Sequence, residues 1–541
     1  MKTKTNINVG RLALAWALLM VFATAPLHAQ TYQDLYDFNC VTGGCFPSDH
    51  GPLTQWKDGN LYGTAGSGGS HGYGTVFKVT PLGTYTDLWQ FDWATGAGPA
   101  SGLTLASDGN FYGTTFVGGS FGYGTLFRFT PPSSLTVLHS FSSVTDEPEV
   151  PPTQAKDGNL YGTTNSGTTY RVTLPGGKFT ELPNQAPGYG GPLYLASDGN
   201  LYGTSFQGGT SNRGTVFRMT TAGAIKTIYN FTGMGSDGNG PAGPLTQGKD
   251  GNLYGTTEYG GGVNDGGTTF TLTLSGIETV LHVFDSSIDG ANPADGLLAS
   301  SYGSFYGTTG FGGIDGDGTL FEMTGAGSCT KFVDFTGDAG TAPGWLPSAP
   351  LMQHTNGSFY GLTIYGGSSG SGNFYNFTPP NPLFTVVVEG PVWLKPGVPV
   401  EILGDNLNEV TSVTFAGVQA QFQAGSDTYL VAQVPSAAFD GFITVTLATG
   451  EQVESQGAVH ILPLITNLDP TSGPVGTQVG IVGGGFIGAT EVTFGGVKAT
   501  NFTVVSPTLI QAIVPTGART GKVVVTTPNG TARSKQTFTV N

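Results

Sequence analysis

The sequence predicts an all-β protein, a seven-bladed β-propeller followed by two immunoglobulin-like β-sandwich domains. The first observation is the phrase Asp58-Gly59-Asn60-Leu61-Tyr62-Gly63-Thr64, which marks one repeat. A single repeat cannot bury its apolar face alone, so neighbouring repeats must share hydrophobic cores. It returns with variations, at intervals of roughly 50 residues, around Tyr112, Tyr161, Tyr202, Tyr254, Tyr306 and Tyr360. The second is period-two alternation, as in Val76-Phe77-Lys78-Val79, which indicates strands. The third is a separate duplication, with a period of roughly 80 residues, after Pro382.

The N-terminal residues 1–29 have the pattern of a secretory signal peptide. Three basic residues, the last of them Arg11, precede an apolar run over residues 12–25 and a small-residue cleavage site at Ala29. A transmembrane anchor is the alternative, but the run is shorter than the roughly 20 apolar residues that a span requires. We therefore expect a secreted or cell-surface protein with no membrane span after signal removal.

The charge of the chain narrows the class of partner. It has 20 basic and 36 acidic residues, and loss of the leader leaves 17 basic against 36 acidic ones, a charge of −19. An acidic surface without a basic cluster argues against nucleic acid and against anionic membranes. An extracellular glycan or protein is the expected partner, and no cofactor is predicted.

Cys40 and Cys45 lie five positions apart, and in an exported protein such a pair can oxidise to close a small loop. Cys329 is distant in sequence and would be left over. Three free or buried thiols are the alternative. Neither Cys40 nor Cys45 has a histidine at metal-ligand spacing, which argues against zinc at this pair.

Each repeat contains four expected strands, which is the composition of one propeller blade. In the second copy they cover residues 103–106, 111–114, 125–130 and 135–141. The turn at Asp108-Gly109 supplies the positive φ angles that tight hairpins demand.

An additional fourth-strand sequence, Leu35-Tyr36-Asp37-Phe38, precedes the first repeat, whereas the seventh copy lacks a clear fourth strand. Because a ring of blades must hide its edge strands, we expect residues 34–38 to pair with the seventh blade and close a propeller over residues 30–382. An open solenoid is the alternative, but it would need polar capping repeats, and the sequence shows none.

The second duplication divides the rest of the chain into residues 383–462 and 463–541. Val413-Thr414-Phe415 in the first half corresponds to Val492-Thr493-Phe494 in the second. Short alternating strands with frequent turns indicate a small immunoglobulin-like sandwich in each half.

Both parts of the chain resemble known families. The stretch from Pro470 to Thr477, with Ile513-Val514-Pro515, closely resembles the IPT/TIG domains, and the first half matches them more loosely. The repeated phrase and the later Gly-Thr-Val-Phe resemble the bacterial GloVer (Gloeo/Verruco) repeat. The resemblances imply an exported bacterial protein without a common catalytic site. GloVer proteins often end in a surface-sorting segment, whereas residues 538–541 read as a final strand, so we expect no covalent attachment to the envelope.

The aspartates that open the repeated phrase form an apparent ring of carboxylates. They are Asp58, Asp108, Asp157, Asp198 and Asp250. The sixth and seventh copies have Tyr302-Gly303 and Asn356-Gly357 instead, a variation that a turn tolerates and a catalytic ring would not. We interpret these aspartates as turn residues.

The Gly-Gly loops and the blade-to-blade connections are expected to share one face of the propeller, opposite the Asp-Gly turns. These segments are longer and more varied, so this face is predicted to bind the ligand. The candidate ligand-binding residues are aromatics in these segments: Trp93, Trp345, Phe116, Phe206, Tyr259, Phe311 and Tyr365. Packing between neighbouring blades is the alternative role for these rings.

Two further candidate sites rest on acidic residues. Asp315 and Asp317, and Asn264 with Asp265, offer oxygen ligands for calcium on glycine-rich loops, without EF-hand spacing. Glu258 and Asp265 are the candidate carboxylate pair for glycoside chemistry.

The sequence therefore predicts a non-catalytic recognition or adhesion protein. Its propeller face would bind a glycan or protein, and its sandwich domains would act as spacers or adhesive modules. A propeller enzyme acting on polysaccharide and a structural component of the envelope or matrix are the alternatives.

Overall fold

The computed structural model describes residues 30–41, 43–47, 51–99, 101–144, 146–262, 265–347, 349–380, 382–388 and 392–541. Over these residues the chain forms fifty β-strands and a single short 3-10 helix, η1 (Leu407–Glu409), so the all-β prediction is confirmed. Within the same ranges no helix has the length and apolarity to cross a membrane. The predicted signal peptide, residues 1–29, lies outside the described residues.

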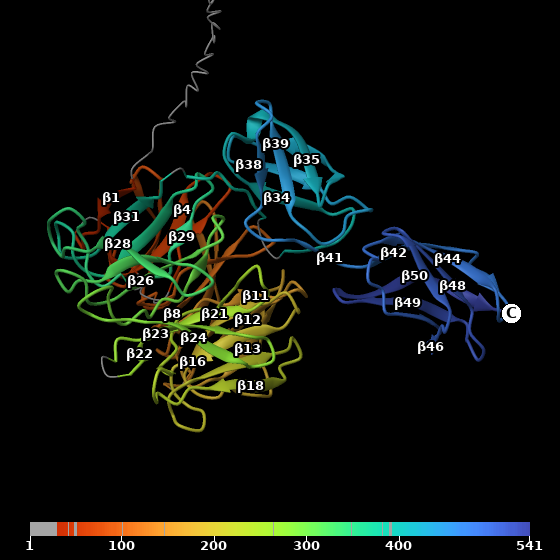
Figure 1. Cartoon of the computed structure of the whole chain (residues 1–541), viewed down its shortest axis with the longest axis horizontal. Helices are drawn as coiled ribbons and strands as arrows, with labels where there is room; N and C mark the ends of the chain where they lie inside the picture. Colours follow the sequence, from red (N-terminus) through yellow and green to blue (C-terminus); the bar gives the residue numbers. More distant parts are fainter. Residues whose placement is uncertain are drawn as a thin grey trace, which may run out of the picture.

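The strands between Thr31 and Thr378 form seven sheets of four or five strands, each built around one copy of the repeated phrase (Figure 1). The first three sheets contain β2 (Gly44–Pro47), β3 (Thr54–Gln55), β4 (Leu61–Gly68), β5 (Thr75–Val79) and β6 (Tyr85–Gln90); β7 (Thr104–Leu105), β8 (Phe111–Thr115), β9 (Thr125–Thr130) and β10 (Ser134–Ser140); and β11 (Thr153–Gln154), β12 (Leu160–Thr163), β13 (Thr169–Thr173) and β14 (Lys178–Glu181).

The remaining four sheets repeat the pattern. They contain β15 (Gly190–Leu195), β16 (Leu201–Ser205), β17 (Thr215–Met219) and β18 (Ile225–Asn230); β20 (Thr246–Gln247), β21 (Leu253–Thr257), β23 (Thr268–Leu272) and β24 (Glu278–Val283); β25 (Leu298–Ala299), β26 (Phe305–Thr309), β27 (Thr319–Met323) and β28 (Cys329–Asp334); and β29 (Met352–Gln353), β30 (Phe359–Thr363), β31 (Asn373–Thr378) and β1 (Thr31–Asp37). A small pair, β19 (Gly238–Asn239) and β22 (Tyr259–Gly260), lies in the loops.

The hydrophobic core lies between the sheets, as a propeller requires. Seven clusters of buried side chains each join one sheet to the next. In one of them the Tyr62 ring stacks on Phe111 of the following sheet at 4.8 Å between ring centroids. Another joins Phe38 and Phe77 to Tyr360 and Phe374 of the seventh sheet, so the ring of sheets is closed.

The N-terminal strand makes this closure. β1 pairs antiparallel with β31, from Thr31 opposite Thr378 to Asp37 opposite Asn373. Phe38, which is fully buried, continues the contact through its N–H, which donates to the Gly372 carbonyl at 2.9 Å. The predicted pairing of this segment with the seventh blade is confirmed, and the strand begins three residues earlier than predicted.

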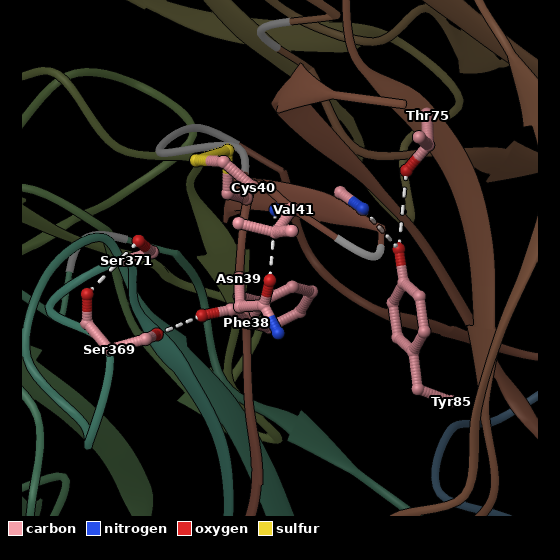
Figure 2. The surroundings of a disulfide bond; sticks show 10 residues. Phe38, Asn39, Cys40, Val41, Thr75, Tyr85, Ser369 and Ser371 are labelled. Atoms are coloured by element: carbon pink, nitrogen blue, oxygen red, sulfur yellow. Dashed lines mark hydrogen bonds between the residues drawn. A yellow bond between two sulfur atoms is a disulfide. The ribbon is translucent and has the colours of Figure 1, made fainter. Parts of the chain in front are cut away.

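A disulfide between Cys40 and Cys45 lies where the chain leaves the seventh sheet and enters the first (Figure 2). After it, β2 adds to β4 as a fifth strand of the first sheet. The Tyr85 hydroxyl accepts the Gly44 N–H at 3.1 Å, and the Ser369 hydroxyl donates to the Phe38 carbonyl. The disulfide therefore links the segment that follows β1 to Cys45 of β2, and these hydrogen bonds hold the two ends of that link.

The repeated Tyr-Gly-Thr has a structural reason at each position. The tyrosine packs between blades, as described for Tyr62. A Cβ on Gly63 would lie 2.7 Å from Phe77 Cζ, so no side chain fits there. The Thr64 hydroxyl donates to the Ser101 carbonyl of the next connection at 2.6 Å, which satisfies a buried polar group.

Two sandwich modules follow the propeller. The first contains β32 (Val387–Val388), β34 (Pro399–Leu403), β38 (Tyr429–Gln433) and β37 (Gln421–Ala424); β33 (Trp393–Leu394) and β41 (His460–Ile461); and β36 (Val418–Gln419), β35 (Val410–Phe415), β39 (Ile443–Leu447) and β40 (Gln452–Glu454). The second contains β42 (Leu464–Asp469), β44 (Gln478–Gly484), β48 (Leu509–Ile513) and β47 (Phe502–Ser506); and β43 (Ser472–Gly473), β50 (Gly530–Val540), β49 (Gly521–Thr527), β45 (Glu491–Phe494) and β46 (Val497–Lys498). Each module has its own buried core.

The first sandwich module contacts the face of the propeller that carries the Asp-Gly turns. The second module lies farther from the propeller (Figure 1). The Thr428 hydroxyl donates to the Lys57 carbonyl at 2.5 Å, and the Thr355 hydroxyl donates to Asp405 at 2.9 Å. Lys57 also forms an ion pair with Glu401 at 3.6 Å. The opposite face of the propeller, which carries the glycine loops, is left open by these contacts.

Candidate functional site

The repeated aspartates make the turns of the blades. Asp58 accepts the Asn60 N–H at 3.1 Å and the Tyr62 hydroxyl at 3.0 Å. The same tyrosine bond recurs at Asp108, Asp157, Asp198 and Asp250. In the sixth blade, which lacks this aspartate, Glu322 accepts the Tyr306 hydroxyl instead. The aspartates thus hold the turn and satisfy a tyrosine hydroxyl, in agreement with their interpretation as turn residues.

Most of the aromatic residues that the sequence proposed for ligand binding are exposed on the open face. Their exposed fractions are 49% for Trp93, 39% for Trp345, 37% for Phe116, 36% for Tyr259, 43% for Phe311 and 37% for Tyr365. Phe206 is half-buried. We call the surface formed by the glycine loops and the blade connections the loop face.

The same rings also pack against each other at the junctions between blades. Trp345 lies 5.1 Å from Tyr365, and Phe206 lies 6.4 Å from Tyr259, measured between ring centroids. Trp93 makes an edge contact with Tyr73 at 5.8 Å. Packing, the alternative role, therefore accounts for part of the surface of these five rings, and ligand binding by their exposed parts stays a prediction.

One hollow of about 330 Å³ interrupts the loop face, between the third, fourth and fifth blades. We call it the loop-face hollow. Its lining consists of Glu149, Val150, Tyr189, Gly190, Gly191, Phe206, Gln207, Pro241, Ala242 and Glu258. It combines two aromatic rings with two carboxylates, and it includes two of the residues that the sequence proposed, Phe206 and Glu258.

The hollow lies beside a shortened loop of the third blade. Only five residues, 164–168, connect β12 to β13, whereas nine residues connect β8 to β9 and nine connect β16 to β17. The short loop forms hydrogen bonds to the acidic connection that precedes β11. Ser166 and Thr168 donate their hydroxyls to Asp146 at 2.9 and 2.7 Å.

Tyr189 and Glu149 form a hydrogen-bonded pair in the wall of the hollow. The Tyr189 hydroxyl donates to Glu149 Oε1 at 2.5 Å. Burial, followed by the neighbouring Glu149 carboxylate, raises the pKa of Tyr189, so its hydroxyl remains a donor at neutral pH. The second oxygen of Glu149 is an acceptor site that a bound hydroxyl group can use.

The two residues of the predicted carboxylate pair have different surroundings. Glu258 lines the hollow, and Asp265 is exposed, does not line it, and accepts the Gly260 N–H at 2.6 Å to shape its own loop. The acid that accompanies Glu258 in the hollow is Glu149.

Glu149 and Tyr189 line the hollow and were not predicted from the sequence. The sequence contained one indication of this site, the segment Asp146-Glu147-Pro148-Glu149, which has three acids among four residues in a chain with only 10% charged residues. The shortened glycine loop of the third copy was a second signal.

Asp315 and Asp317 lie on the loop of the sixth blade. Burial, then the charges of Asp315 and Asp338, raise the pKa of Asp317. A bound cation would relieve this repulsion. The calcium site at these residues stays a prediction.

Two larger hollows, of about 600 and 520 Å³, lie between the propeller and the first sandwich module. Trp393 lines both hollows. Its ring stacks on the His460 ring with 4.4 Å between centroids, and Lys156 Nζ lies 5.6 Å from the Trp393 ring centroid. Trp393 is only 6% exposed, and its contact with Lys156 joins the sandwich module to the propeller. We therefore place the candidate site at the loop-face hollow.

Glu278, on the outer strand of the fifth blade and away from the hollow, has a carboxyl group with a raised pKa. Burial, then the charge of Asp237, raises its pKa from 4.5 to about 7, against the bond donated by Tyr229. Because its pKa is higher in the folded state, ionisation of Glu278 weakens the fold. This cost is absent below pH 4.5 and complete above pH 7.

We expect Glu278→Gln to raise the free energy of unfolding by about 1–2 kcal/mol at pH 8 and to leave it unchanged at pH 4. Urea unfolding at both pH values measures this difference. Glu181→Gln, at an exposed outer-strand position, is the control. An equal gain at the two pH values would contradict the assignment.

The closed ring of seven sheets and its two C-terminal sandwich modules define the class, a tandem-repeat β-propeller protein with immunoglobulin-like domains. The chain belongs to the Gloeobacter/Verrucomicrobia repeat family, whose model matches residues 20–173 and 154–346. The IPT/TIG domain model matches residues 384–461 and 463–540. Both resemblances seen in the sequence are confirmed.

Three of the solved structures that the chain matches are distant likenesses. A catalytically inactive virginiamycin B lyase from Staphylococcus aureus has 18% identity and a TM-score of 0.46, covering 64% of this chain and 99% of its own. SGBP-B from a xyloglucan utilization locus of Bacteroides uniformis has 20% identity and a TM-score of 0.16, covering 29% and 49%. A fungal alcohol oxidase of the AA5 family has 13% identity and a TM-score of 0.43, covering 80% and 98%. All three TM-scores lie below 0.5, so these likenesses carry no weight for function. No curated protein matches the chain significantly.

Proposed function

We propose that the protein is a non-catalytic recognition protein that acts outside the cell and binds a glycan at the loop-face hollow. The observation that carries this proposal is the joint lining of one hollow by Tyr189, Phe206, Glu149 and Glu258. Aromatic faces stack against the C–H faces of sugar rings, and carboxylates accept hydrogen bonds from sugar hydroxyls. Exposed aromatics elsewhere on the loop face would extend the contact along a polymer.

The arrangement of the modules supports this role. The first sandwich module occupies the Asp-Gly-turn face, so the loop face remains accessible to a large ligand. The second module extends the chain away from the propeller and suits a spacer or adhesive part (Figure 1). The disulfide between Cys40 and Cys45 suits an oxidising, extracellular compartment.

A polysaccharide-cleaving enzyme is the second candidate function, because two carboxylates line the same hollow. In that case Glu149 and Glu258 would be the acid pair, in place of the pair that the sequence proposed. Binding is favoured because Glu149 is engaged by the Tyr189 hydroxyl within the wall of the hollow.

The test measures retention of the purified protein on a panel of immobilised polysaccharides together with the release of reducing ends. We expect retention without release. Tyr189→Ala and Phe206→Ala should each weaken binding to the retained polysaccharide by about fivefold to tenfold, since each removes a stacking ring worth about 1–1.4 kcal/mol.

Leu82→Ala is the matched surface control, because Leu82 is 88% exposed on a turn outside the hollow. Wild-type affinity in both aromatic variants would overturn the site. Release of reducing ends that Glu149→Gln and Glu258→Gln abolish would establish the enzyme instead.

A further inference from the structure

The fourth strands of neighbouring blades meet at a recurring pair of positions on the outside of the propeller. The first position follows the bulge of a fourth strand, and His139 opposite Leu126 is an example. The second position lies at the beginning of the next fourth strand, within its first two residues, and Phe179 opposite Val172 is an example. His139 stacks on Phe179 with 3.7 Å between ring centroids. At the junction of the seventh and first blades, Tyr36 and Tyr85 occupy the same positions and stack at 4.6 Å. At both of these junctions, two stacked rings therefore fill the contact between neighbouring fourth strands.

The junction of the fifth and sixth blades is filled differently. By register, His282 opposite Thr269 holds the first position, and Cys329 opposite Met323 holds the second. In place of a second ring, the connection between these blades supplies Asp289. His282 Nε2 and Asp289 Oδ2 are 2.6 Å apart, and the ligand atoms of His282, Asp289 and Cys329 all lie within 4.8 Å of one another.

The three side chains are held in place and reached from solvent. The exposed fraction is 22% for the His282 side chain and 16% for the Asp289 side chain. Asp289 Oδ1 accepts the Asp285 N–H at 2.9 Å, which directs Oδ2 toward the histidine. Cys329 is half-buried and outside the disulfide. Among the described residues this is the only group of three histidine, cysteine or acidic side chains with such spacing.

We propose that His282, Asp289 and Cys329 form a zinc site that joins the fifth blade to the sixth. An imidazole nitrogen, a carboxylate oxygen and a thiolate are all zinc ligands, and the nitrogen and sulfur donors select zinc over calcium. Three protein ligands leave the fourth tetrahedral position to water. On binding, the ion replaces the hydrogen bond between His282 and Asp289. The Nε2 proton of His282 is lost to solvent and Nδ1 is protonated in its place, so the ring binds as a neutral imidazole, and the Cys329 thiol releases its proton to solvent as the Zn–S bond forms.

Calorimetric titration of the metal-free protein with Zn²⁺ tests the proposal, with Co²⁺ as a spectroscopic substitute. We expect one ion per chain, a thiolate-to-cobalt absorption band and a zinc-dependent rise in Tm. Cys329→Ala and His282→Tyr should each weaken zinc binding by more than about tenfold, the loss that even an outer partner of a metal ligand causes. Cys329→Ala should also abolish the thiolate band.

His282→Tyr places at this junction the residue type of Tyr36, so its fold should persist in the metal-free state. His139→Tyr, at the equivalent position of the second blade, is the matched control and should bind zinc as the wild type does. Cobalt spectra without a thiolate band, or unchanged zinc affinity in Cys329→Ala, would overturn the site. Equal losses in His139→Tyr and His282→Tyr would overturn it as well.

Discussion

Replacing Phe38 with alanine should lower the free energy of unfolding of the propeller by about 3–5 kcal/mol. Phe38 is fully buried, and its ring lies 5.4 Å from Phe77 in the cluster that joins the first and seventh sheets. Truncation removes the aromatic contact and leaves a cavity at the junction where the chain has to close its ring. Urea unfolding followed by tryptophan fluorescence measures the effect.

Removal of residues 30–38 is the stronger form of this test, because it exposes the edge of β31 along its whole length. We expect the shortened protein to aggregate or to unfold at a much lower urea concentration. A synthetic peptide of residues 30–38 should partly restore the transition by pairing in trans. A loss below about 1 kcal/mol in Phe38→Ala would show that the N-terminal segment is dispensable for closure.

Replacing Gly203 with alanine should cost about 1–3 kcal/mol. Gly203 is the glycine of the repeated phrase in the fourth blade, and an added Cβ would lie 2.6 Å from Phe217 Cζ and 2.9 Å from Leu193 Cδ2. Both neighbours are buried side chains of the same core, so they have little room to move. Chemical unfolding of the variant measures the cost.

Gly176→Ala is the matched control, because a Cβ there meets nothing within 4 Å and the backbone needs no positive φ. It should be neutral or slightly stabilising. The double variant Gly203→Ala with Phe217→Leu should lose less than the sum of the two single losses, since the smaller side chain relieves the clash. Strict additivity would show that the cost at Gly203 has another origin.

The fold followed from local features of the sequence to a large degree. Asp-Gly turns, alternating strands and the spacing of seven tyrosines each act over a few residues, so they can be recognised without knowing the rest of the structure. The additional fourth-strand sequence at residues 35–38 even predicted how the ring closes, because a ring of sheets must satisfy its last edge.

Only part of the candidate site could be predicted from the sequence. Phe206 and Glu258 were proposed from their positions in the repeat, and the structure places both at the loop-face hollow. Glu149 and Tyr189 were missed because they lie in two separate connections that only the folded ring brings together. Asp265 was paired with Glu258 because both are unusual for their positions in the repeat, whereas in the fold Asp265 accepts the Gly260 N–H and shapes a loop.

By itself the sequence determined the strands, the turns, the number of repeats and the order of the modules, since these depend on short-range backbone preferences and on periodic burial. The tertiary structure alone decided which side chains from different blades meet. Glu149, Tyr189 and Glu258 converge at one hollow, and His282, Asp289 and Cys329 converge at a junction between blades, because the ring places the strands, loops and connections of successive blades side by side. Such convergence depends on the rotation between sheets and on loop length, and no local pattern carries that information.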